Sequence, residues 1–223
     1  SVASSVMQME YRDCIINLLD TPGHQDFSED TYRVLTAVDS ALMVIDAANG
    51  VESQTLRLLE VCRARNTPIV SFINKMDREV KPPMELMDGI ETALGIEVVP
   101  FTWPVGMGKS FAGVIDIANM RMRMFKAGED RVTEDSHAVV DVNDPALKER
   151  LGTDLENALA EVALIKEAMP AFDLEAFLAG RQSPVFFCSA INNFGVREIL
   201  NTLVDLALSP GSRKALPPSP IHL

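Results

Sequence analysis

Short, continuous apolar runs alternate along this chain with stretches of helical spacing, and this alternation constrains the fold most. The runs are residues 40–45 (SALMVI), 68–73 (PIVSFI) and 185–188 (VFFC). Continuous apolar runs of this length are typical of parallel strands buried on both faces. The stretches between and after them predict helices that alternate with the strands. The pattern therefore predicts an α/β fold with a doubly wound, mostly parallel sheet.

Three helices and one further strand complete this alternation. Leu56, Leu59 and Cys62 or Arg63 recur at helical spacing between the first two runs. A second helix is expected over residues 84–94, followed by a strand over 96–101, and a third helix over 196–208. Apolar residues three or four positions apart form one face of a helix that covers the sheet.

A hairpin is expected before the first of these runs. Residues 5–10 alternate loosely, residues 11–13 supply a turn, and an apolar run from Cys14 to Leu19 ends at Asp20. Two such runs joined by a short turn predict a β-hairpin, which we expect to enter the sheet.

The alternation fails between Trp103 and Gln182. One short strand is expected there at residues 113–117, and one helix over residues 145–167. We interpret this region as an inserted α+β subdomain. The expected organisation is a core at residues 1–103, an insertion at 104–182, a last strand and helix at 183–208, and a proline-rich linker or tail at 209–223.

The stretch VGMGKS at residues 105–110 ends like a phosphate-binding P-loop. A P-loop reads G-x-x-x-x-G-K-[ST], because its first glycine lets the backbone fold round the phosphates. In this chain that position holds Trp103, and Pro104 lacks one of the N–H donors that the loop needs. The stretch is therefore not expected to bind a nucleotide.

Charge and cysteine usage exclude some classes of function. The net charge of −12 argues against wide contact between this chain and a nucleic-acid backbone. The three cysteines, Cys14, Cys62 and Cys188, lie far apart in apolar runs and show no metal-binding spacing, so we expect reduced, buried thiols. The sequence contains neither an apolar run long enough to span a membrane nor a signal sequence at its start, and we expect a cytoplasmic protein.

Three loops follow predicted strands and carry polar residues suited to a nucleotide. In an open α/β sheet, ligands bind outside the carboxyl ends of the strands. The first loop is Asp20-Thr21-Pro22-Gly23-His24. A carboxylate that leaves a buried strand can orient a hydrated Mg²⁺, and a glycine can bring its N–H against a terminal phosphate.

The second loop, Asn74-Lys75-Met76-Asp77, is suited to guanine. An aspartate can accept hydrogen bonds from both N1–H and the 2-amino group of guanine, and adenine lacks both donors. Asn74 can bond the ring and hold neighbouring loops, while the aliphatic part of Lys75 can cover the face of the base. The third loop, Ser189-Ala190, can donate the Ala190 amide to guanine O6. The three loops in this order predict a guanine-nucleotide domain.

These loops resemble the translational GTPase family, whose G domain carries D-T-P-G-H, N-K-x-D and S-A loops in the same order. The resemblance covers about residues 1–208. Three stretches resemble the branch that acts on peptide chain release factors in translation termination more than elongation factor G: residues 26–33, 83–88 and 102–106. Residues 105–110 then resemble the entry to that family's insertion.

The resemblance implies a sheet of the P-loop GTPase type that binds GTP or GDP with Mg²⁺. Asp20 would hold Mg²⁺ through water, and Ser1 matches the last position of a switch segment whose hydroxyl touches the metal. The family's P-loop and its strand lie upstream of this segment. We therefore expect the chain to be a piece of a longer protein, inactive alone, with an apolar gap and unpaired strand edges in its sheet.

The resemblance also implies a mechanism and partners. The residues that match the GTP-binding loops are Asp20, Thr21, Pro22, Gly23, His24, Asn74, Lys75, Met76, Asp77, Ser189 and Ala190. Gly23 would contact the γ-phosphate, and His24 is the expected catalytic residue, which positions the attacking water once large-subunit ribosomal RNA orients it. The implied partners are the ribosome and class I peptide release factors, with a monomeric protein and no membrane.

Alternatives remain open from the sequence. One is a ribosomal GTPase like elongation factor G, and another is an interaction fragment that does not hydrolyse GTP. A dinucleotide oxidoreductase is not expected, because the chain contains no G-x-G-x-x-G motif.

Overall fold

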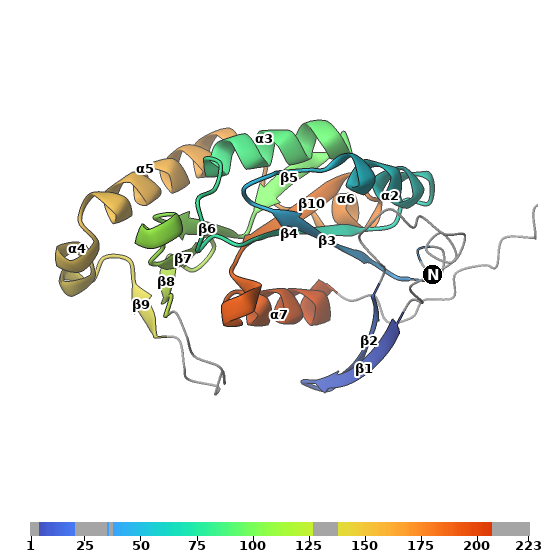
Figure 1. The fold of residues 1–223 in the computed structure, drawn as a ribbon, viewed down its shortest axis with the longest axis horizontal. Helices are drawn as coiled ribbons and strands as arrows, with labels where there is room; N and C mark the ends of the chain where they lie inside the picture. Colours follow the sequence, from blue (N-terminus) through green and yellow to red (C-terminus); the bar gives the residue numbers. More distant parts are fainter. Residues whose placement is uncertain (1–4, 21–34, 36–37, 127–137, 207–223) are drawn as a thin grey trace, which may run out of the picture.

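The computed structural model of the protein describes residues 5–20, 35, 38–126 and 138–206 (Figure 1). The strands are β1 (Ser5–Tyr11), β2 (Cys14–Asp20), β3 (Ala41–Asp46), β4 (Ile69–Asn74), β5 (Glu97–Pro100), β6 (Thr102–Val105), β7 (Gly113–Asp116), β8 (Arg121–Met124), β9 (Val139–Asp141) and β10 (Gln182–Phe187). The helices are α2 (Ser53–Ala64), α3 (Pro83–Leu94), α4 (Pro145–Leu151), α5 (Thr153–Ala168), α6 (Leu174–Leu178) and α7 (Val196–Leu206).

A four-stranded parallel sheet forms the centre of the molecule, with the strand order β3-β4-β10-β5. Its strands come from the predicted apolar runs. Strand β4 is buried along nearly its whole length, and β10 is buried at every position. Burial on both faces is why these runs are continuous rather than alternating. The predicted α/β fold with a parallel sheet is confirmed.

Helices cover both faces of this sheet (Figure 1). One face packs against α2 and α3, whose buried residues include Leu59, Leu86 and Ile90. The opposite face packs against α6 and α7 through Phe177 and Ile199. Residues of β4 alternate between the two clusters, with Ile69 and Ile73 in the first and Val70 and Phe72 in the second. The sheet is doubly wound, as the alternation of runs predicts.

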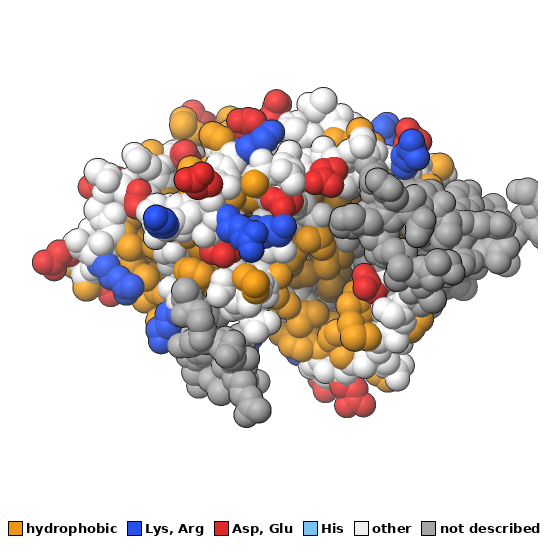
Figure 2. Space-filling view, viewed as in Figure 1, with side chains coloured by type: hydrophobic (Ala, Val, Ile, Leu, Met, Phe, Trp, Pro, Cys, Tyr) orange, Lys and Arg blue, Asp and Glu red, His pale blue; other side chains and the backbone are white. Residues whose placement is uncertain are grey.

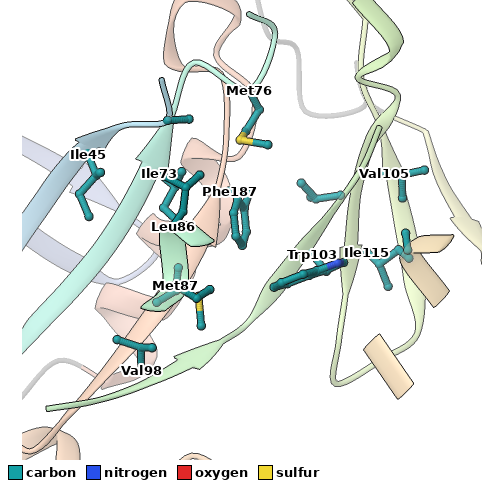
Figure 3. Packing of buried hydrophobic residues seen from close by; sticks show 14 of the residues in the cluster. Ile45, Ile73, Met76, Leu86, Met87, Val98, Trp103, Val105, Ile115 and Phe187 are labelled. Atoms are coloured by element: carbon teal, nitrogen blue, oxygen red, sulfur yellow. The ribbon is translucent and has the colours of Figure 1, made fainter. Parts of the chain in front are cut away.

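A second, antiparallel sheet with the order β6-β7-β8-β9 is formed by strands between Thr102 and Asp141. It does not form a separate core. Trp103 on β6 is fully buried, its ring centroid lies 5.3 Å from that of Phe187 in the parallel sheet, and its indole N–H donates to Glu161 on α5 at 2.8 Å. Figure 3 shows Trp103 between Phe187 and Ile115. One continuous hydrophobic cluster therefore joins the two sheets.

The local structure of this region differs from the sequence prediction. The single helix expected over residues 145–167 is wrong: α4 ends at Leu151 and α5 begins at Thr153. Gly152 separates them with a φ of 49°, a conformation outside the α-helical region. The expected strand at residues 113–117 is confirmed as β7, whereas β6, β8, β9 and α6 were not predicted. The domain boundaries at 103–104 and 182–183 stay a prediction.

The N-terminal hairpin is confirmed, because β1 and β2 pair in antiparallel register from Ser5 and Asp20 to Tyr11 and Cys14. Its expected entry into the parallel sheet is wrong for the described residues, where β1 and β2 form a two-stranded sheet of their own. The turn of the hairpin is held by α7 instead. The Tyr11 hydroxyl donates to Asn201 at 2.9 Å, and Arg12 pairs with Asp205 at 2.7 Å.

Strand β3 forms one edge of the parallel sheet among the described strands. Its two faces differ sharply, because Met43 and Ile45 are buried under the helices while Leu42 and Val44 are 36% and 55% exposed. Figure 2 shows hydrophobic side chains gathered in the hollow between the sheet and α7. Apolar surface is therefore exposed along β3 in the described part of the chain, and the expected gap and unpaired edges stay a prediction.

Among the described residues, no helix combines the length and the apolar character needed to cross a bilayer. The longest of these helices, α5, has 16 residues.

Candidate functional site

The loops that follow β4 and β10 meet at the carboxyl edge of the parallel sheet. The two strands are neighbours in parallel register, so their carboxyl ends point the same way. Backbone hydrogen bonds then tie the loops together: the Cys188 amide donates to Ile73 O at 2.9 Å, and the Met76 amide donates to Cys188 O at 3.0 Å. The predicted loops 74–77 and 189–190 therefore form one site.

The side chain of Asn74 holds both loops. Its Oδ1 atom accepts the Lys75 amide and the Ala190 amide, each at 2.8 Å. Lys75 has a φ of 74°, in the left-handed region that non-glycine residues rarely adopt. The hydrogen bond from its own amide to Asn74 stabilises this conformation. With Oδ1 engaged, the amino group of Asn74 is the part that can donate to a ligand.

Asp77 is oriented by Ser189. The buried Ser189 hydroxyl donates to Asp77 Oδ1 at 2.6 Å and accepts from the Asn192 side-chain amide at 2.7 Å. A short hydrogen bond to a carboxylate is strong and directional. Asp77 itself is half-buried, so its carboxylate is fixed in place and still accessible. This arrangement suits a ligand with two adjacent N–H donors.

Lys75 forms an ion pair with Asp46, which sequence reasoning missed. Its ammonium group lies 2.6 Å from Asp46 Oδ2 at the end of β3. Burial by itself raises the pKa of Asp46, but hydrogen bonds from Lys75 and from the Ala48 amide outweigh it, so the pKa lies below its ordinary value. The sequence feature that could have identified Asp46 is its position directly after an apolar run, which the predicted loop residues share.

Cys188 lies directly behind the site. Its thiol donates to Ile73 O at 3.2 Å, and burial, with a smaller effect from the Asp77 carboxylate, raises the pKa of the thiol well above its ordinary value. Burial also raises the pKa of Cys62. All three cysteines, Cys14, Cys62 and Cys188, are free. Cys62 and Cys188 are buried as predicted, whereas the prediction of a buried thiol is wrong for Cys14, which is half-buried.

The Ala190 amide, predicted to donate to guanine O6, donates to Asn74 in this structure. A purine oxygen at the site would compete with Asn74 for that N–H group. The neighbouring Ile191 is 74% exposed, beside the same amide. The role of Ala190 stays a prediction, and the structure places its amide on the site.

The first predicted loop is described only in part. Asp20 ends β2 and is exposed. Thr21, Pro22, Gly23 and His24, and also Ser1, lie outside the described residues. Within the described ranges, no group of three or more His, Cys, Asp or Glu residues could hold a metal ion.

A depression of about 750 Å³ opens beside Asp77. The 78–80 segment lines one side of it, and the residues Met107, Gly108, Lys109 and Ser110 line another. The depression therefore joins the loop 74–77 to the stretch that superficially resembles a P-loop. The site can hold a planar polar group at the carboxylate and is open to solvent beside it.

Comparisons with known proteins identify relatives over nearly the whole chain. Peptide chain release factor 3 of Nitrosomonas europaea is 69% identical over 217 residues, which cover 97% of this chain and 41% of that protein. Peptide chain release factor 3 of Bordetella avium is 68% identical over 216 residues, covering 97% of this chain and 40% of that protein. The chain thus spans about 40% of the length of these relatives.

A solved structure from Thermus thermophilus has the same fold, with a TM-score of 0.68 and 22% identity over 91% of this chain and 32% of that one. The family model described as the elongation factor Tu GTP binding domain matches residues 1–209. With its site loops at the carboxyl ends of β4 and β10, the chain belongs to the family of the elongation factor Tu GTP binding domain.

Proposed function

We propose that this chain is the GTP-binding part of a translational GTPase that acts in translation termination. In this proposal the complete protein promotes release or recycling of class I peptide release factors on the ribosome and hydrolyses GTP. The proposal rests on one observation above all: Asp77 is fixed by Ser189 beside the Asn74–Ala190 link. The family match and the names of the relatives support it.

The Asp77 carboxylate is the hydrogen-bond acceptor by which the site would distinguish guanine from adenine. Asp77 Oδ2 is free of the Ser189 bond, and a carboxylate fixed in this way can accept from N1–H and the 2-amino group of guanine together. Adenine offers neither donor at these positions and would leave the carboxylate unpaired. A site built on hydrogen bonds rejects an analogue that lacks the donors far more strongly than an apolar pocket does.

Lys75 and Met76 complete the base site. The ion pair with Asp46 fixes the end of the Lys75 side chain, and we propose that its aliphatic part covers the face of the base. Met76 is fully buried and contributes its backbone, which anchors the loop to Cys188. We assign both residues to nucleotide binding for these reasons.

Mg²⁺ fits the donor set if the nucleotide supplies most of its ligands. Magnesium is commonly held by one or two carboxylates together with phosphates and water. Asp20 is an exposed carboxylate at the end of a strand, which suits contact through water, and Ser1 is the second proposed contact. The ion would neutralise charge on the phosphates during hydrolysis.

Hydrolysis is assigned to the loop 20–24. We propose that Gly23 contacts the γ-phosphate and that His24 positions the attacking water when ribosomal RNA of the large subunit orients its imidazole. The ribosome and class I release factors are the proposed partners, and the protein is proposed to act as a monomer in the cytoplasm.

The base site is tested with Asp77→Asn in the complete protein. The wild type should bind GTP far more tightly than ATP, and the variant should shift its preference toward XTP, whose 2-oxo group accepts the hydrogen bond that the new amide donates. Competition binding with GTP, ATP and XTP measures this. Unchanged preference in the variant would remove Asp77 from the base site and contradict the proposed nucleotide.

Hydrolysis is tested separately with His24→Ala in the complete protein. GTP binding should stay near wild type, while ribosome-stimulated turnover should fall roughly 10² to 10⁴-fold, the range that a positioned catalytic group contributes. The comparison needs GTP affinity and single-turnover hydrolysis on the same preparation. Wild-type turnover would show that His24 has no catalytic role.

A further inference from the structure

The stretch 105–110 is not a P-loop, but it forms a tight turn after β6. Gly106 and Gly108 have φ values of 72° and 58°, both in the left-handed region that favours glycine. The Ser110 hydroxyl closes the turn by accepting the Met107 amide at 3.2 Å and donating to Met107 O at 3.0 Å. A Cβ atom at Gly106 would lie 2.1 Å from Ser110 O, so the turn needs glycine there.

This turn contacts the loop 74–77 directly through its backbone. The Gly108 amide donates to Met76 O at 3.0 Å, while the amide of Met76 donates to Cys188 O at 3.0 Å. Met76 is thus held on one side by the loop after β10 and on the other by the turn. A Cβ atom at Gly108 would lie 3.2 Å from Arg78 O, against the backbone that leads away from Asp77.

The turn is itself firmly anchored. It follows Val105, which is fully buried on β6, and the same strand carries Trp103 (Figure 3). The Trp103 indole N–H donates to Glu161 on α5. Its far end is fixed as well, because the Ala112 amide donates to Val105 O at 2.9 Å. The support for the loop 74–77 therefore comes from the antiparallel sheet as well as from the parallel sheet.

We propose that the turn 106–110 is a positioning element for guanine recognition. By donating to Met76 O, the Gly108 amide fixes the position of the loop 74–77 and therefore the position of the Asp77 carboxylate. This inference rests on the proposed function of the site as a guanine-nucleotide site. It assigns to residues 106–110 a task in base selectivity that their P-loop-like sequence does not suggest.

The test is Gly108→Ala in the complete protein, with GDP and IDP as probes. IDP lacks the 2-amino group, so the ratio of the two affinities reports the contact with Asp77. The added methyl group presses on Arg78 O and the left-handed φ is strained for alanine, so GDP affinity should fall about tenfold. The preference for GDP over IDP should shrink toward one.

Gly95→Ala is the matched control. Gly95 ends α3 with a φ of 61°, close to that of Gly108, and a Cβ atom there would meet only the flexible Arg63 side chain. The backbone strain is therefore similar, and the melting temperature should fall by a similar amount. The ratio of GDP to IDP affinity should stay at the wild-type value. A purely structural role of Gly108 would make the two variants behave alike.

A milder variant covers the case in which Gly108→Ala does not fold. Ser110→Ala removes the hydroxyl that closes the turn and should lower the GDP to IDP ratio in the same direction, by a smaller factor. A folded Gly108→Ala or Ser110→Ala variant with the wild-type ratio would overturn the inference. A wild-type protein that does not prefer GDP over ADP would instead overturn the proposed function, so the two failures are distinguishable.

Discussion

Asn74→Ala should weaken nucleotide binding and stability together, because one atom of this side chain joins both loops of the site. Asn74 Oδ1 accepts two backbone amides at 2.8 Å, from Lys75 and from Ala190. A typical hydrogen bond contributes about 0.5–1.5 kcal/mol net, so the pair is worth about 1–3 kcal/mol. The side chain is half-buried, and water can partly replace it, so we expect about 2 kcal/mol.

That loss has two measurable consequences in the complete protein. The melting temperature should fall by about 4–8 °C, since 1 kcal/mol shifts a domain of this size by roughly 2–4 °C. In the variant, GDP has to order the two separated loops when it binds, and the cost of this ordering is taken from the binding free energy. A cost of about 2 kcal/mol would lower the affinity for GDP by up to about 25-fold, because 1.4 kcal/mol corresponds to a factor of ten. Calorimetric titration and differential scanning calorimetry measure the two effects.

Asn119→Ala provides the control. Asn119 makes one exposed side-chain hydrogen bond, to Asp116 at 2.8 Å in the turn between β7 and β8. Its loss should change stability by no more than about 0.5 kcal/mol and leave GDP affinity unaltered. If Asn74→Ala melts like Asn119→Ala and binds GDP like the wild type, then the Asn74–Ala190 link does not support the site.

Two further outcomes follow from pKa values. Burial raises the pKa of Cys62 and Cys188, so thiolate-specific reagents at mildly alkaline pH should modify the half-buried Cys14 first in the native protein. Peptide mapping by mass spectrometry measures the order of labelling, and early labelling of Cys188 would contradict the packing behind the site. Because the pKa of Asp46 is lowered, its ion pair with Lys75 stabilises the fold above about pH 4 and is lost as the pH falls further. The difference in free energy of unfolding between wild type and Asp46→Asn, measured by urea titration, should therefore shrink below about pH 4. A difference that stays constant with pH would show that the ion pair adds no stability.

The parallel sheet could be predicted from the sequence because its strands are buried on both faces. Such strands appear as uninterrupted apolar runs, and the runs at 68–73 and 185–188 coincide with β4 and the end of β10. The loops at their ends then follow from topology, since parallel neighbours bring their carboxyl ends together. For this reason Asn74, Asp77, Ser189 and Ala190 could be assigned to one site.

The antiparallel sheet could not be predicted in the same way. Strand β6 contains Pro104, which argues against a strand, and β8 alternates Arg and Met over only four residues. Strand β9 has three residues, too few for any pattern to appear. The ion pair of Asp46 with Lys75 and the contact of Gly108 with Met76 depend on how separate segments pack, and no local pattern encodes them.

The position of β10 in the sheet bears on how the chain folds as it is synthesised. This strand joins β4 to β5, yet about 80 residues separate its start from the end of β5. At about 5–20 residues per second, a ribosome needs roughly 4–16 s to make that segment. During this time β4 and β5 have been synthesised without the strand that lies between them in the sheet. Assembly of the site formed by the loops 74–77 and 189–190 therefore has to wait until β10 has been synthesised.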